Sequence, residues 1–155
     1  GLDRTNPGAS FSPRLKEGAE ISDLGYGELY PEGLYRVLRR VQRYGKPVYV
    51  TENGLPDRDD DRRPRFILSH LAQLWRAMQE GVQVRGYYHW SLVDNFEWAE
   101  GYAMRFGLIE VDFATQKRRI RESGRLYGEI CQANAITPEL VERYAPAAAA
   151  EIFGA

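Results

Sequence analysis

Hydrophobic residues recur along the middle of the chain at spacings typical of alternating helices and strands. After Pro31, leucines and valines follow one another at helical spacing. The short β-branched run Val48–Val50 then predicts a buried strand. Apolar residues from Ile67 to Met78 mark one face of a second helix, and a second strand is predicted from Val82 to Trp90. Strand, helix and strand within this length predict a βαβ unit with two parallel neighbouring strands.

The patterns on either side of this unit are weaker. Residues 1–28 are rich in Gly, Pro and Ser and are predicted to form a loop, and residues 91–105 predict a second, aromatic loop. The C-terminal third predicts an extended piece, a helix, a short helix with Thr137 as its N-cap, and an Ala-rich end expected to fray. These elements lie at residues 108–113, at about Glu122 to Ala133, from Pro138 onward, and at 146–155.

The ends of the two predicted strands link the fold to chemistry. Glu52 and Trp90 both stand at the C-terminal ends of neighbouring parallel strands, which is the end where α/β barrels carry their active sites. A barrel of this kind needs eight strands, so two are too few to close one. We therefore expect residues 1–155 to form a single partial TIM-barrel domain, with Val48 and Val50 facing the barrel interior.

Composition and charge narrow the classes of function. The 155 residues carry a net charge of -1, with 43% hydrophobic and 28% charged residues. This balance argues against an electrostatic binder of nucleic acid or membranes, and no apolar run approaches the roughly 20 residues of a membrane span. Cys131 is the single cysteine, which we expect to be buried; a lone cysteine favours a reducing compartment, and hence a cytoplasmic protein. The first residues lack Met and are not a signal peptide, so we expect the chain to enter in mid-protein.

Two groups of polar residues could suggest a metal site. The run 57–61 begins like a calcium loop, but Arg62 stands where the loop needs Gly and Leu68 where it needs Glu. A solvated charged loop is therefore predicted. His70 is expected to be a structural histidine of a helix, and His89 to face away from the barrel centre because neighbouring strand residues alternate. We expect neither a metal nor a cofactor.

Two motifs carry the main functional signal. Glu52 lies in Thr51-Glu52-Asn53-Gly54, which taken alone allows a structural role as readily as a catalytic one. The segment Gly86–Trp98 (GYYHWSLVDNFEW) is longer, aromatic and more specific. Together the two motifs resemble family 1 of the glycoside hydrolases, the β-glucosidase family. Further matches follow in family order at Tyr30–Tyr35, Gly101–Tyr102, Arg105–Leu108 and Val111–Phe113. The resemblance covers most of the chain and implies the C-terminal portion of a (β/α)8 TIM barrel, namely strands seven and eight with their helices.

The resemblance also implies roles for individual residues. Glu52 would be the nucleophile of a retaining β-glycosidase that hydrolyses terminal β-D-glucosyl residues. Glu97 would accept hydrogen bonds from sugar hydroxyls at the O4/O6 end, and Trp98 would donate its indole N–H to a neighbouring hydroxyl. Trp90 would form the floor under the sugar ring and Phe106 the pocket wall. Because Glu97 would repel a phosphate group, we expect unphosphorylated β-glucosides or related oligosaccharides as substrates.

The departures from the family pattern limit this interpretation. The acid/base Glu of the family lies in an Asn-Glu-Pro motif that does not occur in these residues, and the Tyr that orients the nucleophile is also lacking. Tyr26 stands where the family commonly has Trp, and we expect no effect on the chemistry. One hypothesis is a site completed by the missing N-terminal part of the barrel, with the chain alone inactive and poorly soluble. The alternative is a non-catalytic truncated fragment or a carbohydrate-binding remnant that uses Trp90, Glu97 and Trp98.

Overall fold

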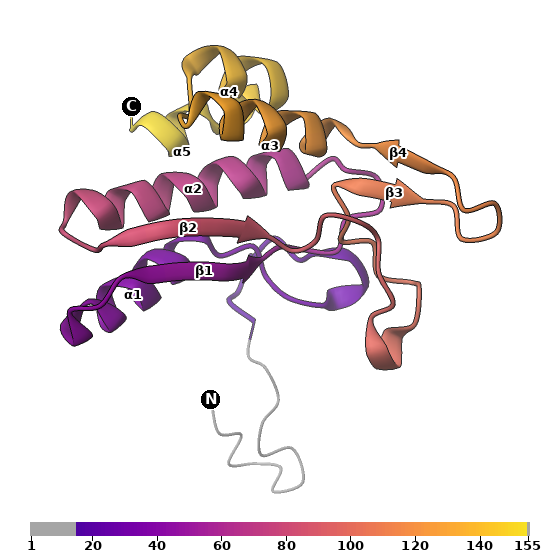
Figure 1. The fold of residues 1–155 in the computed structure, drawn as a ribbon, viewed down its shortest axis with the longest axis horizontal. Coiled ribbons are helices and arrows are strands. Elements are labelled where there is room, and N and C mark those ends of the chain that lie inside the picture. Colours follow the sequence, from indigo (N-terminus) through magenta and orange to yellow (C-terminus); the bar gives the residue numbers. More distant parts are fainter. Residues whose placement is uncertain (1–14, 155) are drawn as a thin grey trace, which may run out of the picture.

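The computed structural model describes residues 15–154, so residues 1–14 of the predicted N-terminal loop lie outside it. Figure 1 shows β1 and β2 side by side, with α2 above β2 and the C-terminal helices above α2. The helices and strands are α1 (Pro31–Val41), β1 (Val48–Asn53), α2 (Arg63–Gln79), β2 (Val84–His89), β3 (Ile109–Val111), β4 (Arg118–Ile120), α3 (Glu122–Ala133), α4 (Pro138–Tyr144) and α5 (Ala149–Phe153).

The predicted βαβ unit is confirmed. β1 and β2 pair in parallel, with Val48 opposite Val84 and Asn53 opposite His89, and α2 connects the two strands. The second strand is shorter at both ends than the predicted stretch from 82 to 90. Parallel neighbours joined by a helix place the carboxyl ends of both strands at the same edge of the sheet.

The orientation predicted for β1 is wrong. Val50 belongs to a buried cluster with Leu38 of α1 and Leu74 of α2, and Val48 packs against the same cluster. The valines therefore face the helices, because the helices around this βαβ unit cover one face of the sheet and take up its β-branched side chains. Tyr49 is 57% exposed on the opposite, bare face, where the barrel interior was expected.

The C-terminal helices form a second layer on α2. Leu126 and Ile130 of α3 pack in one cluster with Ile67 and Leu68 of α2 and with α4. The bounds predicted for α3 are confirmed. Cys131, predicted to be buried, is exposed. It follows Ile130 by one residue, about 100° further round the helix, so it leaves the stripe that faces α2.

The elements after residue 105 follow the predictions only in part. Thr137 accepts a hydrogen bond from the Leu140 N–H at 3.4 Å, which confirms the predicted N-cap. The Ala-rich end contains a 3-10 turn at Pro146–Ala148 followed by α5. β3 confirms the predicted extended piece and pairs antiparallel with the unpredicted β4. None of the helices in the described part of the chain has the length and apolarity needed to cross a membrane.

Candidate active site

Glu52 lies near the carboxyl end of β1, as predicted from the sequence, and its side chain is exposed. The register between β1 and β2 shifts between Val50 and Asn53. Strict alternation from Val50 therefore does not determine the direction of Glu52, and such irregularities commonly re-aim a side chain beside an active site. Asn53 ties the turn to β2, because its side-chain Oδ1 accepts from the Tyr87 hydroxyl at 2.9 Å.

The turn after Glu52 lies directly against the backbone of Trp90. The Trp90 N–H donates to the Asn53 carbonyl at 3.0 Å. A Cβ built on Gly54 would lie 1.7 Å from the Trp90 carbonyl oxygen, so no side chain fits at this position. The structure thereby brings the strand end of Glu52 together with Trp90, which is half-buried and follows β2.

The loop after Trp90 is held by a buried carboxylate. The side chain of Asp94 is 0% exposed and forms ion pairs with Arg121 at 3.0 Å and Arg105 at 3.2 Å. The backbone N–H groups of Gly107, at 2.9 Å, and Val111, at 3.2 Å, donate to the same carboxylate. Burial alone would raise the pKa of Asp94, but the bonds from Arg121 and Gly107 lower it below its ordinary value. Sequence reasoning gave Asp94 no role, because its partners lie up to 27 residues away.

Glu97 is half-buried within this loop, and each of its carboxylate oxygens has its own donor. The Asn95 side-chain amide donates to Oε2 at 2.9 Å. The Tyr26 hydroxyl donates to Oε1 at 3.3 Å, from a turn 71 residues earlier in the sequence. Trp98, the next residue, is 82% exposed. The structure therefore gives Glu97 a defined orientation and leaves the Trp98 indole open to solvent.

Phe106 is buried, with 2% of its surface exposed, and Tyr26 covers it. The two rings meet edge to face, with centroids 5.3 Å apart and an interplanar angle of 81°. Tyr26 thus contacts both Phe106 and Glu97, and the expectation that it has no effect on the chemistry stays a prediction. Only the departure from the commoner Trp marked this residue in the sequence.

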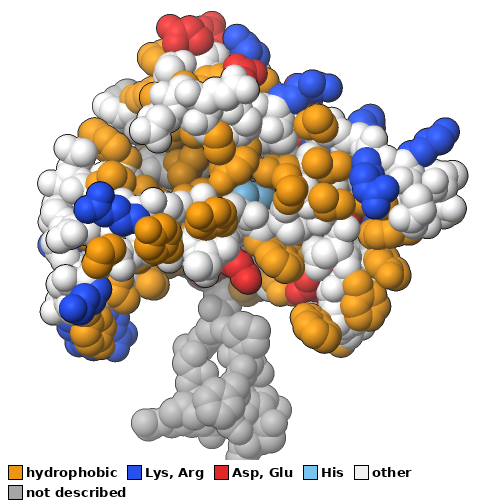
Figure 2. Space-filling view, in the orientation of Figure 1, with side chains coloured by type: hydrophobic (Ala, Val, Ile, Leu, Met, Phe, Trp, Pro, Cys, Tyr) orange, Lys and Arg blue, Asp and Glu red, His pale blue; other side chains and the backbone are white. Residues whose placement is uncertain are grey.

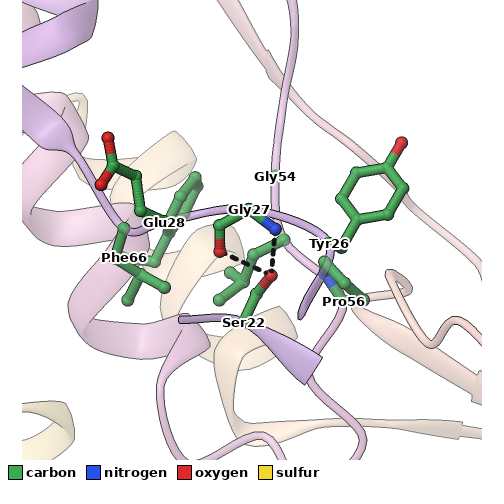
Figure 3. Close-up of a pocket in the computed structure, with 9 residues that line it drawn as sticks. Ser22, Tyr26, Gly27, Glu28, Gly54, Pro56 and Phe66 are labelled. Atoms are coloured by element: carbon green, nitrogen blue, oxygen red, sulfur yellow. Dashed lines mark hydrogen bonds between the residues drawn. The ribbon is translucent and has the colours of Figure 1, made fainter. Parts of the chain in front are cut away.

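A small pocket lies beside the turn that follows Glu52 (Figure 3). Its volume is about 50 Å³, and its lining includes Ser22, Gly54 and Phe66. The Ser22 hydroxyl donates to the Gly27 carbonyl at 2.9 Å and accepts from the Gly27 N–H at 3.1 Å, which closes the turn that carries Tyr26. Ligand pockets typically measure about 300–1,000 Å³, so this pocket is too small to hold a sugar ring.

The acidic run after Gly54 includes a carboxylate that binds the backbone at the start of α2. Asp57 is fully buried and accepts from the backbone N–H groups of Arg62 at 3.0 Å and Arg63 at 2.9 Å. The prediction of a solvated loop is therefore wrong for Asp57, because the first turn of α2 needs acceptors for its N–H groups. Asp59 and Asp61 are exposed, as predicted. Within residues 15–154, His, Cys, Asp and Glu side chains form no group of three that could hold a metal.

Both histidines lie in the core beside the helices. His70 is 4% exposed, and its Nδ1 donates to the Phe66 carbonyl at 2.8 Å, which confirms a structural histidine. His89 is 8% exposed and packs against Phe66 and Tyr127, at centroid distances of 6.2 and 6.1 Å. It therefore faces away from the bare face of the sheet, as predicted. Burial lowers the pKa of His70 to about 4 and that of His89 to about 3.

Comparisons with known proteins place this geometry in one family. Residues 7–136 match the model of glycosyl hydrolase family 1. A β-galactosidase of Sulfolobus acidocaldarius is 52% identical over 120 residues, which are 77% of this chain and 24% of that protein. The structure resembles a β-glycosidase from Pyrococcus horikoshii with a TM-score of 0.79 and 44% identity, covering 84% of this chain and 31% of that one. It also resembles a family 1 β-glucosidase from Thermotoga maritima in complex with isofagomine lactam, with a TM-score of 0.76 and 40% identity over 79% of this chain and 30% of that one. The chain thus spans about a quarter of the length of the curated relatives it matches.

Proposed function

Because this chain belongs to glycosyl hydrolase family 1, we propose that it carries the nucleophile half of a retaining β-glycosidase site, with Glu52 as the nucleophile. The observation that carries the proposal is the contact between the turn after Glu52 and the backbone of Trp90. This contact brings the strand end that carries Glu52 together with Trp90 at one edge of a parallel sheet, where α/β barrels hold their substrates. By the same family pattern, the chain supplies strands seven and eight of such a barrel.

In the proposed reaction Glu52 attacks the anomeric carbon of a β-glucoside and forms a covalent glycosyl-enzyme. A second carboxyl group about 5–5.5 Å away protonates the leaving oxygen and then activates the water that releases the sugar, with overall retention of configuration. Glu97 and Trp98 hold the far hydroxyls of the sugar, and Trp90 lies under its ring. Phe106 supports the wall of the sugar pocket from the protein interior. Unphosphorylated glucosides and galactosides are the favoured substrates, because the carboxylate of Glu97 would repel a phosphate group on the sugar.

We propose that the second carboxyl group comes from further barrel strands that pair with β1 and β2. Tyr49 and Tyr88 are 57% and 58% exposed on the bare face of these strands, and Leu92 beyond β2 is 65% exposed. Figure 2 shows hydrophobic side chains gathered over this part of the molecule. Exposed apolar surface of this kind favours association with another segment over contact with water.

A mechanism-based label tests the assignment of Glu52. The complete enzyme, meaning this chain within its full reading frame or joined to the N-terminal portion of a family 1 relative, is incubated with a 2-deoxy-2-fluoro-β-glucoside. We expect stoichiometric label on the peptide that contains Glu52, and loss of both label and turnover in Glu52→Gln. Glu100→Gln, which changes an exposed carboxylate in the loop that carries Glu97, serves as the matched control and should be labelled normally. Label on any other residue would refute the assignment.

The second candidate function is non-catalytic carbohydrate binding. The observation that favours it is the 82% exposure of Trp98 beside the fixed carboxylate of Glu97, an arrangement that suits stacking on a sugar. Hydrolysis of an aryl β-glucoside by the chain alone distinguishes the two functions. We expect no turnover by the chain alone and restored turnover in the complete enzyme. The binding function would be favoured if cellobiose quenches the fluorescence of Trp98 in a complete enzyme that hydrolyses no glucoside.

A further inference from the structure

Tyr26 reaches the loop that carries Glu97 from a turn 71 residues earlier in the sequence. Its turn is fixed at several points. Asp23 accepts from the Arg58 N–H at 2.7 Å and pairs with the guanidinium of Arg62, and Ser22 closes the turn from within. The aromatic ring then lies edge to face on Phe106 at 5.3 Å. These contacts hold the ring independently of the Tyr26 hydroxyl group.

Within residues 15–154, the hydroxyl group of Tyr26 hydrogen-bonds to Glu97 alone. It donates to Oε1 at 3.3 Å, while Asn95 donates to Oε2 at 2.9 Å. Two donors on two different oxygens fix the plane of a carboxylate, which could otherwise rotate about its terminal torsion. Each oxygen keeps a second lone pair that can accept from a ligand hydroxyl. Burial and the neighbouring negative charge of Glu97 raise the pKa of Tyr26, so the phenol remains protonated and can donate at neutral pH.

We propose that Tyr26 is a positioning residue that orients the Glu97 carboxylate toward the sugar hydroxyls through its phenol O–H. This inference rests on the proposed function, because it assumes that Glu97 holds the sugar. It deepens that function by making recognition of the far hydroxyls depend on a hydrogen bond across two distant loops. Recognition of those hydroxyls should therefore be sensitive to the phenol itself, whereas the covalent chemistry at Glu52 should not.

The test is Tyr26→Phe in the complete enzyme, since Phe keeps the ring that packs on Phe106. Two substrates are compared, 4-nitrophenyl β-glucoside and its 4,6-dideoxy analogue, which lacks the hydroxyls assigned to Glu97. We expect kcat/KM for the glucoside to fall about three- to tenfold, mainly through KM, the effect of losing one hydrogen bond. The value for the dideoxy analogue should stay unchanged. In a Glu97→Gln background, Tyr26→Phe should have little further effect, because the two residues act together.

Tyr35→Phe is the matched control. The Tyr35 hydroxyl donates to Glu80 at 2.9 Å, so the substitution also removes a phenol–carboxylate bond, but near the start of β2, at the far end of the sheet. It should change neither substrate. Equal losses for glucoside and dideoxy analogue in Tyr26→Phe, or no loss in an enzyme still labelled at Glu52, would overturn this inference alone. An enzyme that is not labelled at Glu52 overturns the proposed function and this inference with it.

Discussion

Asp94→Asn removes the charge that anchors the loop from Ser91 to Phe106. The substituted amide has nearly the same shape, but it offers one acceptor oxygen in place of two to the donors around it. Arg121, whose side chain is 5% exposed, then keeps a buried positive charge without its counter-charge. The backbone N–H groups of Gly107 and Val111 compete for the remaining oxygen.

The expected magnitude follows from this burial. Removing one partner of a buried, hydrogen-bonded ion pair typically costs about 3–5 kcal/mol, because the other charge stays desolvated. Each 1.4 kcal/mol corresponds to about a factor of ten in an equilibrium constant, so the loop should open about two to almost four orders of magnitude more often. Hydrogen exchange followed by mass spectrometry measures this opening, because peptides that contain Gly107 and Val111 report on the amides bound to Asp94.

Glu110→Gln provides the comparison on the neighbouring hairpin. Glu110 pairs with Arg119, but these side chains are 38% and 80% exposed. An exposed pair contributes at most about 1 kcal/mol, so exchange in the same peptides should change less than about fivefold. Exchange in Asp94→Asn no faster than in Glu110→Gln would refute the reasoning that a buried ion pair holds the loop.

Two further predictions concern pH and solubility. As the pH falls from 6.5 to 5, the unfolded chain binds protons that buried His70 and His89 do not, because their folded pKa values lie near 4 and 3. The free energy of unfolding should therefore fall by roughly 2 kcal/mol for each histidine. The urea midpoint should be lower at pH 5 than at pH 7, and this shift should be smaller in His89→Phe. Equal midpoints at the two pH values in the unchanged protein would contradict this prediction. Replacing Tyr49 and Tyr88 together by Thr should at least double the soluble fraction of the chain, because both side chains are exposed on the bare strand face. Tyr44→Thr, which changes an equally exposed tyrosine on the helical side, should leave that fraction unchanged, and equal gains from both changes would count against the explanation.

Local patterns predicted those parts of the fold that local forces determine. The bounds of α3 follow from its apolar stripe, and Thr137 caps α4 because an N-cap acts within three residues. β4 escaped prediction because Arg118–Ile120 is exposed throughout and has no buried alternation to mark it. The direction predicted for the Val50 side chain was wrong, because the strand pattern shows which residues are buried but not whether helices or a barrel interior bury them.

The candidate site also combines features that the local sequence predicts with features that depend on distant contacts. Glu52 could be placed from its sequence, since a carboxylate at a strand end needs only the strand to be recognised. The donors to Glu97 could not be placed, because Tyr26 joins it from 71 residues away and no local pattern carries that contact. Asp57 was misread for a related reason: a run of charges predicts solvation, whereas the helix start of α2 requires a buried acceptor at one position of that run.

The two glutamates of the site differ in how firmly the chain holds them. Glu97 has a donor on each oxygen and lies in a loop anchored by buried Asp94. Glu52 is exposed, and within residues 15–154 no group donates a hydrogen bond to its carboxylate. A nucleophile needs its attacking oxygen held close to the reacting carbon, since a misplacement of about 1 Å can cost about a hundredfold in rate. We therefore propose that the further barrel strands, which would supply the second carboxyl group, would also supply the groups that orient Glu52. Hydrolysis and orientation of the nucleophile should then be gained together when those strands are joined to β1 and β2.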